Sequence, residues 1–121
     1  MNNGVHIIEI ARIKHSLENP KFLSRLFSPQ ELKFLMGKHF SPSFISEVYC
    51  AKCAFVKAMG MSFRGCTLNQ ISVLTDYIDS PYISLTGATK MKFASKKCQM
   101  TVSISHTKTY AAAVVTFFQN P

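Results

Sequence analysis

The sequence predicts a single α+β domain over residues 1–121, in which a mostly antiparallel sheet packs on one long central helix. The length of 121 residues fits one domain, and a 47% share of hydrophobic residues is enough to form a core. Along the chain the patterns indicate a strand, then helices, then strands with one more helix. This order favours the α+β class.

The central helix is expected over Phe44–Gly60. Its apolar residues recur at steps of three and four and form one stripe: Phe44, Val48, Ala51, Phe55 and Ala58. A second apolar stripe beside the first predicts that the helix is buried on most sides. Ser41 is a candidate N-cap, Pro42 suits the first turn, and Gly60 suits the position just after the helix.

The segments before the central helix are expected to form a strand, a helix, a short amphipathic piece and a second helix. Their expected ranges are Gly4–Ile10, Ala11–Leu17, Lys21–Phe27, and a helix that starts after Ser28 and ends near residues 37–40. The start of this last helix has Ser28 as N-cap, Pro29 in the first position and Glu31 in the third. Together these residues predict a capping box.

The segments after the central helix are expected to form a loop, a hairpin, a basic helix and a second hairpin. The expected ranges are the loop Met61–Thr67, the strands Gln70–Thr75 and Tyr82–Leu85 around the turn Asp79–Pro81, the helix Gly87–Lys97, and the strands Met100–Ile104 and Tyr110–Phe118 joined by Ser105–Thr109. Met91 and Phe93 are expected on the apolar side of the basic helix. Tyr110 and Phe117 are interpreted as core residues.

The formal net charge of +8 favours an anionic partner, such as a phosphorylated ligand, an acidic protein, a membrane surface or nucleic acid. Binding of nucleic acid would need aromatic residues exposed beside basic ones on a strand, and the strand aromatics are interpreted as core, which argues against it. The longest apolar run, Tyr110–Val115, is too short to span a bilayer, and no signal peptide is seen at the start. We therefore expect a cytoplasmic protein that does not span a membrane and whose four cysteines are thiols.

Two cysteines and two lysines interrupt the apolar surface of the central helix. Cys50 and Cys53 form a C-x-x-C pair, but a second closely spaced pair for zinc is lacking and the pair is not at a helix N-terminus, so we expect packing residues. Lys52 and Lys57 need an anionic partner, unless their stems run along the core edge and place the ammonium groups in water. Both interpretations of the lysines stay open at this point.

Three blocks of the sequence carry a family resemblance together. They are Gly4–Ile10 running into Arg12; Tyr49–Ala54 followed by Lys57, Ala58 and Gly60; and Val102–Thr107 followed by Tyr110–Val115. In this order and spacing they resemble the motifs G-x-D-x-x-E-I, F-A-A-K-E-A with K-A-x-G, and S-I-S-H-[TE] of the holo-acyl-carrier-protein synthase family, the small 4'-phosphopantetheinyl transferases. The segments Lys21–Leu32 and Ser80–Tyr82 also resemble parts of this family, so the likeness covers nearly the whole chain.

The resemblance implies a 4'-phosphopantetheinyl transferase-like fold and a transferase of fatty acid biosynthesis. Such enzymes move the 4'-phosphopantetheine group of coenzyme A onto a serine of apo-acyl carrier protein and release adenosine 3',5'-bisphosphate. The family uses Mg²⁺ on the pyrophosphate of coenzyme A, and it is typically a homotrimer with active sites between subunits. Acyl carrier protein, coenzyme A and two further copies of the chain are therefore the expected partners.

The chain departs from the family at both metal-ligand positions, where His6 replaces an aspartate and Cys53 replaces a glutamate. Imidazole and thiol are poor ligands for Mg²⁺. Three interpretations stay open: the pyrophosphate and water hold the Mg²⁺ while lysines supply more charge; Zn²⁺ or Mn²⁺ replaces it; or the chain is an impaired or inactive member that still binds coenzyme A or carrier protein. His6 could also be a strand histidine whose hydrogen bonds are satisfied.

Other positions carry over from the family more directly. The resemblance assigns catalytic roles to Lys57 and Lys52, and it assigns coenzyme A binding to Lys57, Gly60, Pro81, Ser105, His106 and Thr107. His106 could instead be a turn residue bonded to its own loop. The region that docks the acidic carrier protein matches the basic residues Arg12, Lys14, Lys21 and Arg25, which could otherwise form a solvated basic face.

Overall fold

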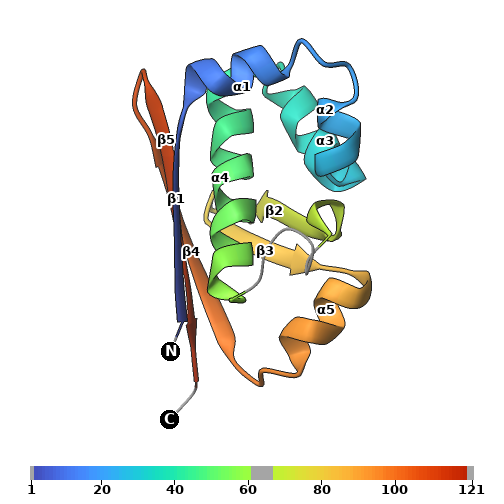
Figure 1. Cartoon of the computed structure of the whole chain (residues 1–121), viewed down its shortest axis with the longest axis vertical. Coiled ribbons are helices and arrows are strands. Elements are labelled where there is room, and N and C mark those ends of the chain that lie inside the picture. Colours follow the sequence, from blue (N-terminus) through green and yellow to red (C-terminus); the bar gives the residue numbers. More distant parts are fainter. Residues whose placement is uncertain (1, 61–66, 120–121) are drawn as a thin grey trace.

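The structure is a computed structural model that describes residues 2–60 and 67–119. Its elements are β1 (Asn2–Glu9), α1 (Ile10–Ser16), α2 (Phe22–Leu26), α3 (Pro29–Gly37), α4 (Pro42–Ala58), the 3-10 helix η1 (Leu68–Gln70), β2 (Ile71–Thr75), β3 (Pro81–Leu85), α5 (Gly87–Ala94), β4 (Gln99–His106) and β5 (Tyr110–Phe118). Figure 1 shows α4 between a sheet on one side and the remaining elements on the other. The predicted α+β class with a central helix is confirmed.

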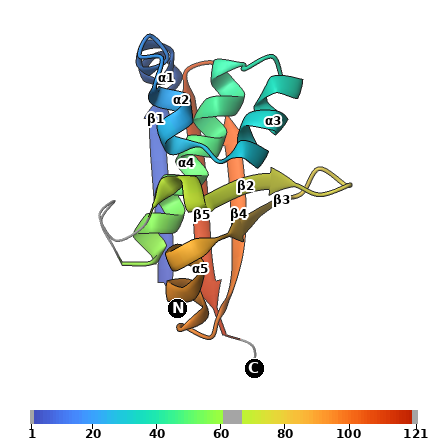
Figure 2. The ribbon, with the colours of Figure 1, turned by 90° about the vertical axis from the view of Figure 1, so that its right-hand side faces the viewer.

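Within the described residues, the strands form two antiparallel sheets rather than one. The larger sheet has the order β1-β5-β4, and β2 pairs with β3 in the smaller sheet. In Figure 2 the smaller sheet crosses in front of the larger one, with α4 between them. The predicted ladders are therefore correct in direction, but they form separate sheets: α4 packs between the larger sheet and β2, whereas β3 lies next to β4.

The long helix α4 starts and ends as the sequence predicts, with one difference in its cap. Ser41 is the N-cap residue and Pro42 occupies the first turn, but the Ser41 side chain makes no capping hydrogen bond. At the other end Gly60 has a φ of +71°, the left-handed conformation that stops a helix at glycine. Residues 61–66 of the predicted loop, which include Arg64, Gly65 and Cys66, lie outside the described residues.

Strand β1 lies unusually close to α4 at Gly4. A Cβ atom added there would come within 1.8 Å of the carbonyl oxygen of Ala54 and 2.6 Å of the backbone nitrogen of Ala58. Backbone therefore meets backbone, which only glycine on the strand and small residues on the helix permit. This contact fixes the distance between β1 and the helix face next to it.

Several shorter predictions need correction. The capping box of α3 is present in full, but α5 ends at Ala94 and not near Lys97. Met91 is 76% exposed rather than packed, whereas Phe93 packs as expected, with its ring centroid 5.0 Å from that of Phe117. Tyr110 was expected in the core and is 45% exposed, because alternation along β5 turns it to the outer face of the sheet.

The last hairpin has a shorter link than expected. Strand β4 runs through Ser105 to His106, where the sequence predicted a loop from Ser105 to Thr109. The Thr107 side chain closes the turn by accepting hydrogen bonds from the backbone amides of Thr109 and Tyr110. Among the described residues, no helix is both long enough and apolar enough to cross a membrane.

Candidate active site

One face of α4 meets strand β1, and the two predicted metal positions lie one on each of these elements. Tyr49, Cys53 and Lys57 are spaced four residues apart and so share this face. His6 comes from β1, and its ring centroid is 6.0 Å from that of Tyr49 in an edge-on contact. The Nζ atom of Lys57 donates a hydrogen bond of 2.9 Å to the carbonyl oxygen of Val5, the neighbour of His6. We call these four residues, His6, Tyr49, Cys53 and Lys57, the β1–α4 site.

The β1–α4 site has a single charged group at neutral pH, the ammonium of Lys57. Burial, and secondarily the nearby charge of Lys57, lowers the pKa of His6 and keeps its imidazole neutral. Cys53 is only 1% exposed, and burial raises the pKa of its thiol to about 11. Burial, followed by the neighbouring Cys53, raises the pKa of Tyr49 to about 12. The site therefore offers a cation and three uncharged side chains.

These residues do not fit the magnesium ion that the family resemblance implies. Mg²⁺ prefers hard oxygen ligands, usually carboxylates, at short distances. The Nδ1 atom of His6 is buried without a hydrogen-bond partner, and Cys53 is a buried neutral thiol. Within residues 2–60 and 67–119 no group of three or more His, Cys, Asp or Glu side chains is placed to hold a metal, so zinc has no closed site there either. The orphaned Nδ1 atom also excludes the alternative that His6 is a fully satisfied strand histidine.

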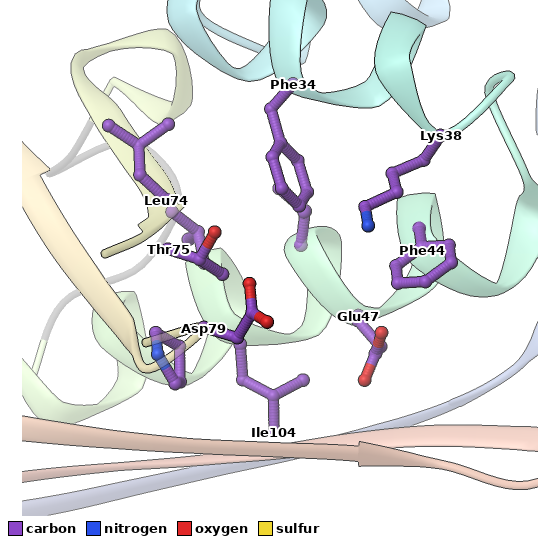
Figure 3. Close-up of a pocket in the computed structure, with 11 residues that line it drawn as sticks. Phe34, Lys38, Phe44, Glu47, Leu74, Thr75, Asp79 and Ile104 are labelled. Carbon is purple, nitrogen blue, oxygen red and sulfur yellow. The ribbon is translucent and has the colours of Figure 1, made fainter. Parts of the chain in front are cut away.

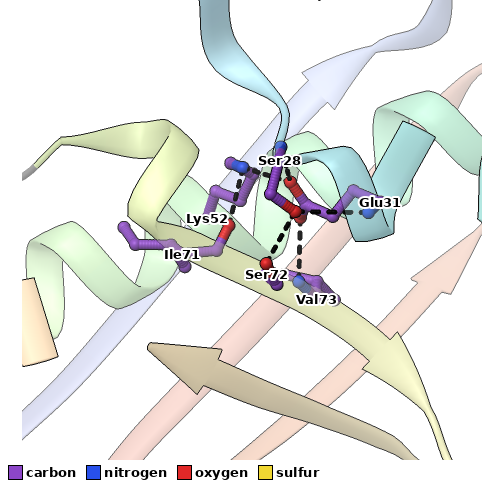
Figure 4. Close-up of polar contacts among 6 residues, drawn as sticks. All are labelled: Ser28, Glu31, Lys52, Ile71, Ser72 and Val73. Atoms are coloured by element: carbon purple, nitrogen blue, oxygen red, sulfur yellow. Dashed lines mark hydrogen bonds and ion pairs between the residues drawn. The ribbon is translucent and has the colours of Figure 1, made fainter. Parts of the chain in front are cut away.

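Lys52 faces away from the β1–α4 site and is fully buried. Its Nζ atom donates to the carboxylate of Glu31 and, at 2.7 Å, to the carbonyl oxygen of Ile71. Figure 4 shows how the same carboxylate accepts hydrogen bonds from the backbone amides of Ser28 and Val73 at 2.9 and 2.8 Å. The ammonium of Lys52 thus ties α4 to α3 and β2. The interpretation that the lysine ammonium groups lie in water is therefore wrong for Lys52 and correct for Lys57, which is exposed. The catalytic role predicted for Lys52 stays a prediction, and this placement argues against it.

The second group of predicted binding residues lies around a cavity of ≈ 250 Å³ on the other side of α4. Pro81, at the start of β3, lines this cavity together with side chains that the sequence reasoning did not assign to a site: Phe34, Lys38, Phe44, Asp79 and Ile104. Figure 3 shows Lys38 and Phe44 at one side and Asp79 at the other. The Lys38 Nζ atom lies 5.2 Å from the Phe44 ring centre, a cation–π contact. No local motif singles out Lys38, because it follows α3 and reaches the cavity only through the tertiary fold.

His106 lies beside this cavity and is held by α4. Its Nδ1 atom is 3.3 Å from a carboxylate oxygen of Glu47, and its ring centroid is 6.1 Å from that of Phe44. The alternative that His106 bonds to its own loop is therefore wrong. Ser105 points to the opposite, outer face of the sheet, and Thr107 is used in the turn, so these two residues do not join His106 at the cavity.

The two groups of predicted binding residues do not meet within one chain. Lys57 and His6 lie at the β1 edge of the larger sheet, and Gly60 follows Lys57 at the end of α4. His106 belongs to β4 at the opposite edge, with β5 between them. Two strand spacings alone separate these edges by roughly 10 Å.

The four basic residues predicted to dock a carrier protein are all exposed on or beside α1 and α2: Arg12, Lys14, Lys21 and Arg25. Figure 1 shows these two helices at the same end of the molecule. Arg12 also lines a small hollow of ≈ 180 Å³ with Glu9 and Tyr110, next to the end of β1. A charged surface therefore adjoins the strand that carries His6.

Comparison with known proteins places this geometry in a family. Residues 3–115 match the 4'-phosphopantetheinyl transferase superfamily. The chain is 37% identical over 111 residues to a holo-[acyl-carrier-protein] synthase of Clostridium botulinum, covering 91% of this chain and 90% of the relative. A relative of the same name from Treponema denticola is 34% identical over 115 residues, which are 93% of each chain.

A solved structure agrees with the sequence relatives. The Helicobacter pylori holo-[acyl-carrier-protein] synthase in complex with coenzyme A superposes with a TM-score of 0.81 at 29% identity, covering 96% of this chain and 99% of that one. The fold predicted from the resemblance is thus confirmed. The chain belongs to the 4'-phosphopantetheinyl transferase superfamily, in the holo-[acyl-carrier-protein] synthase family that its motifs resemble.

Proposed function

We propose that this chain transfers the 4'-phosphopantetheine group of coenzyme A to a serine of apo-acyl carrier protein and releases adenosine 3',5'-bisphosphate. The observation that supports this most is the match over nine-tenths of the chain to relatives named for this activity. The bound coenzyme A of the Helicobacter pylori structure supports the same substrate here. A transferase of this kind serves fatty acid biosynthesis, and the free thiols of Cys50, Cys53 and Cys98 suit the reducing cytoplasm.

Lys57 is the side chain of the β1–α4 site that we assign to the phosphates of coenzyme A. Its head group is exposed, held by Val5, and directed toward the strand edge. A fixed ammonium stabilises the charge that develops on phosphate oxygens as the bond to the leaving group breaks. Gly60 leaves open space where its Cβ would be, so a ligand can approach the backbone closely. No step of this proposal uses a metal held by side chains.

The working form that we propose is a homotrimer with the site between subunits. The outer face of the larger sheet exposes Val5, Ile7, Tyr110 and Val114, with exposed fractions between 39% and 63%. These residues are cross-strand neighbours, since Val5 pairs with Val114, and β4 adds the uncharged Ser103 and Ser105 beside them. Glu9 borders this face beside Tyr110, and a contiguous apolar patch of this kind marks a protein interface.

Oligomer formation would also bring the two groups of binding residues together across a boundary between subunits. Lys57 at one sheet edge and His106 at the other would face a single coenzyme A if they came from neighbouring subunits. Light scattering coupled to size exclusion should give three times the chain mass of 13.6 kDa. Val114→Arg should reduce this to the monomer mass, and a wild-type monomer would refute the assembly.

The carrier protein is proposed to dock at the exposed basic residues of α1 and α2. Acidic partners are attracted to such a surface over long range, which mainly speeds the encounter and weakens with salt. Arg12 lies nearest to β1 and so could contact both partners. The other three residues lie on the rim, where each exposed pair contributes about 0.2–1 kcal/mol.

The experiment that tests the function is intact mass spectrometry of apo-acyl carrier protein after incubation with the chain and coenzyme A. The expected result is a mass gain of one phosphopantetheine group, which is lost when the carrier serine is replaced by alanine. If coenzyme A binds but the mass never changes, the transfer is refuted. That outcome would favour the alternative suggested by the substitutions at His6 and Cys53, namely a protein that binds coenzyme A but does not catalyse transfer.

A further inference from the structure

The β1–α4 site has lost negative charge and kept positive charge compared with the family pattern. His6 and Cys53 stand at the two positions where the resemblance places carboxylates, and both are uncharged. A divalent cation that entered here would find no anionic ligand and would face the ammonium of Lys57. The site therefore repels the ion that its relatives are expected to bind.

Other carboxylates do not replace the missing pair. Glu47 lies on another face of α4 and is engaged by His106 at 3.3 Å. Glu9 alternates to the outer side of β1 and lines the hollow with Arg12. Glu31 is fully buried and bound to Lys52. In the part of the chain that the structure describes, these carboxylates all have other partners or face elsewhere.

Lys57 lies close to both substituted positions. It lies one helical turn beyond Cys53 on the same face of α4, and its Nζ atom bonds to the carbonyl oxygen of Val5, which adjoins His6. This bond uses one of the three ammonium donors and leaves two for a ligand. The head group is thus held in place by the backbone, exposed to a ligand, and close to the two positions where the family pattern has carboxylates.

The charge that a pyrophosphate meets is the same in both arrangements. In the family pattern two carboxylates cancel the two charges of Mg²⁺, and the helix lysine leaves one net positive charge. In this chain both carboxylates are replaced by neutral side chains, so no metal is needed to cancel their charge. The ammonium of Lys57 then gives the site the same net charge of one positive unit. Loss of one carboxylate alone would unbalance the site, whereas loss of both does not.

We propose that the pyrophosphate of coenzyme A binds the β1–α4 site without a divalent cation, with the Lys57 ammonium in the place of the metal. This inference rests on the proposed function, since it takes coenzyme A as the ligand. It concerns binding by the chain's own residues, so it can be measured without turnover.

The experiment is isothermal titration of coenzyme A into the full chain, once with EDTA and once with millimolar Mg²⁺. The dissociation constant should agree within about twofold between the two conditions, because the site has no ligand for the metal. Lys57→Gln should weaken binding by about 10- to 100-fold, the usual size for a charge-assisted hydrogen bond. Lys90→Gln, an exposed lysine on α5 outside the site, is the matched control and should bind like wild type.

The outcomes separate this inference from the proposed function. Binding that is lost in EDTA, or that Mg²⁺ tightens tenfold or more, overturns the metal-free site and leaves the coenzyme A function intact. Equal binding by wild type and Lys57→Gln, with circular dichroism showing both folded, also overturns it. Absence of binding in both conditions overturns the proposed function itself. Titration of Mn²⁺ alone into the chain gives a second check, and saturable binding at the site would count against the inference.

Discussion

Replacing Lys52 by methionine tests whether this lysine holds the fold together or takes part in catalysis. Methionine keeps the length and apolar stem but removes the ammonium that bonds Glu31 and Ile71. The carboxylate of Glu31 would then stay buried with only its two backbone donors, the amides of Ser28 and Val73. An ion that loses its partner in a fully buried position is strongly destabilising.

The expected magnitude follows from the complete burial of the pair. Both side chains are 0% exposed, so solvent does not screen their interaction. Breaking such a pair from one side costs about 3–5 kcal/mol, out of a total stability of about 6–18 kcal/mol for a domain of this length. At roughly 4 °C per kcal/mol, the melting temperature should fall by about 12–20 °C.

The assay is urea unfolding of wild type, Lys52→Met, Glu31→Gln and the double variant. The double variant should be less destabilised than the sum of the single variants, with a coupling energy of about 0.5–3 kcal/mol. Lys33→Met, an exposed lysine on α3, is the control and should change stability by about 0.5 kcal/mol or less. A loss below 1 kcal/mol for Lys52→Met, together with lost coenzyme A binding, would refute the structural role and restore the catalytic one.

Five further measurements address the site and its surroundings. The imidazole of His6 should titrate below its usual pKa of 6.5 in an NMR experiment, and Lys57→Gln should raise this pKa because it removes a nearby positive charge. Since folding disfavours the protonated imidazole, the free energy of unfolding should decrease as the pH falls below 6.5, and His6→Phe should remove this part of the decrease. At pH 8, iodoacetamide should label the half-buried Cys98 well before Cys53, whose pKa is raised to about 11; equal rates in peptide mass spectra would contradict the buried thiol. His6→Asp should make coenzyme A binding weaker in EDTA and responsive to Mg²⁺, and no change would show that the position does not face the phosphates. Arg25→Glu should slow carrier-protein association at low salt while coenzyme A binding stays the same, and an unchanged rate would place the docking surface elsewhere.

Features set by short-range interactions could be predicted from the sequence. The capping box needs only Ser28 and Glu31 three residues apart, and it is present with both of its hydrogen bonds. The stop of α4 needs only a residue that tolerates a positive φ, which Gly60 supplies. His6 and Cys53 could be placed together because the order of motifs resembles a known family, not because spacing alone requires it.

Features that depend on distant pairs could not be predicted. The same Glu31 that caps α3 also receives Lys52, a residue 21 positions later, and nothing local indicates this second role. The cavity beside His106 joins Lys38, Phe44 and Asp79 from separate elements. Tyr110 was assigned to the core because an aromatic residue on a strand is usually buried, but the sheet has an exposed apolar face that a single chain leaves uncovered.

The glycine that opens the first motif explains why the site keeps its shape while its metal positions change. Gly4 lets β1 approach the backbone of α4 at Ala54 and Ala58, and any side chain there would push strand and helix apart. Because Lys57 reaches Val5 across this contact, a wider separation would detach its ammonium from the strand even though Gly4 touches no ligand itself. The geometry of the β1–α4 site is therefore set by packing between small residues, and the chemistry is set by the side chains at His6, Cys53 and Lys57. The two can vary independently, so the chain can exchange carboxylates for neutral groups without losing the fold that presents Lys57.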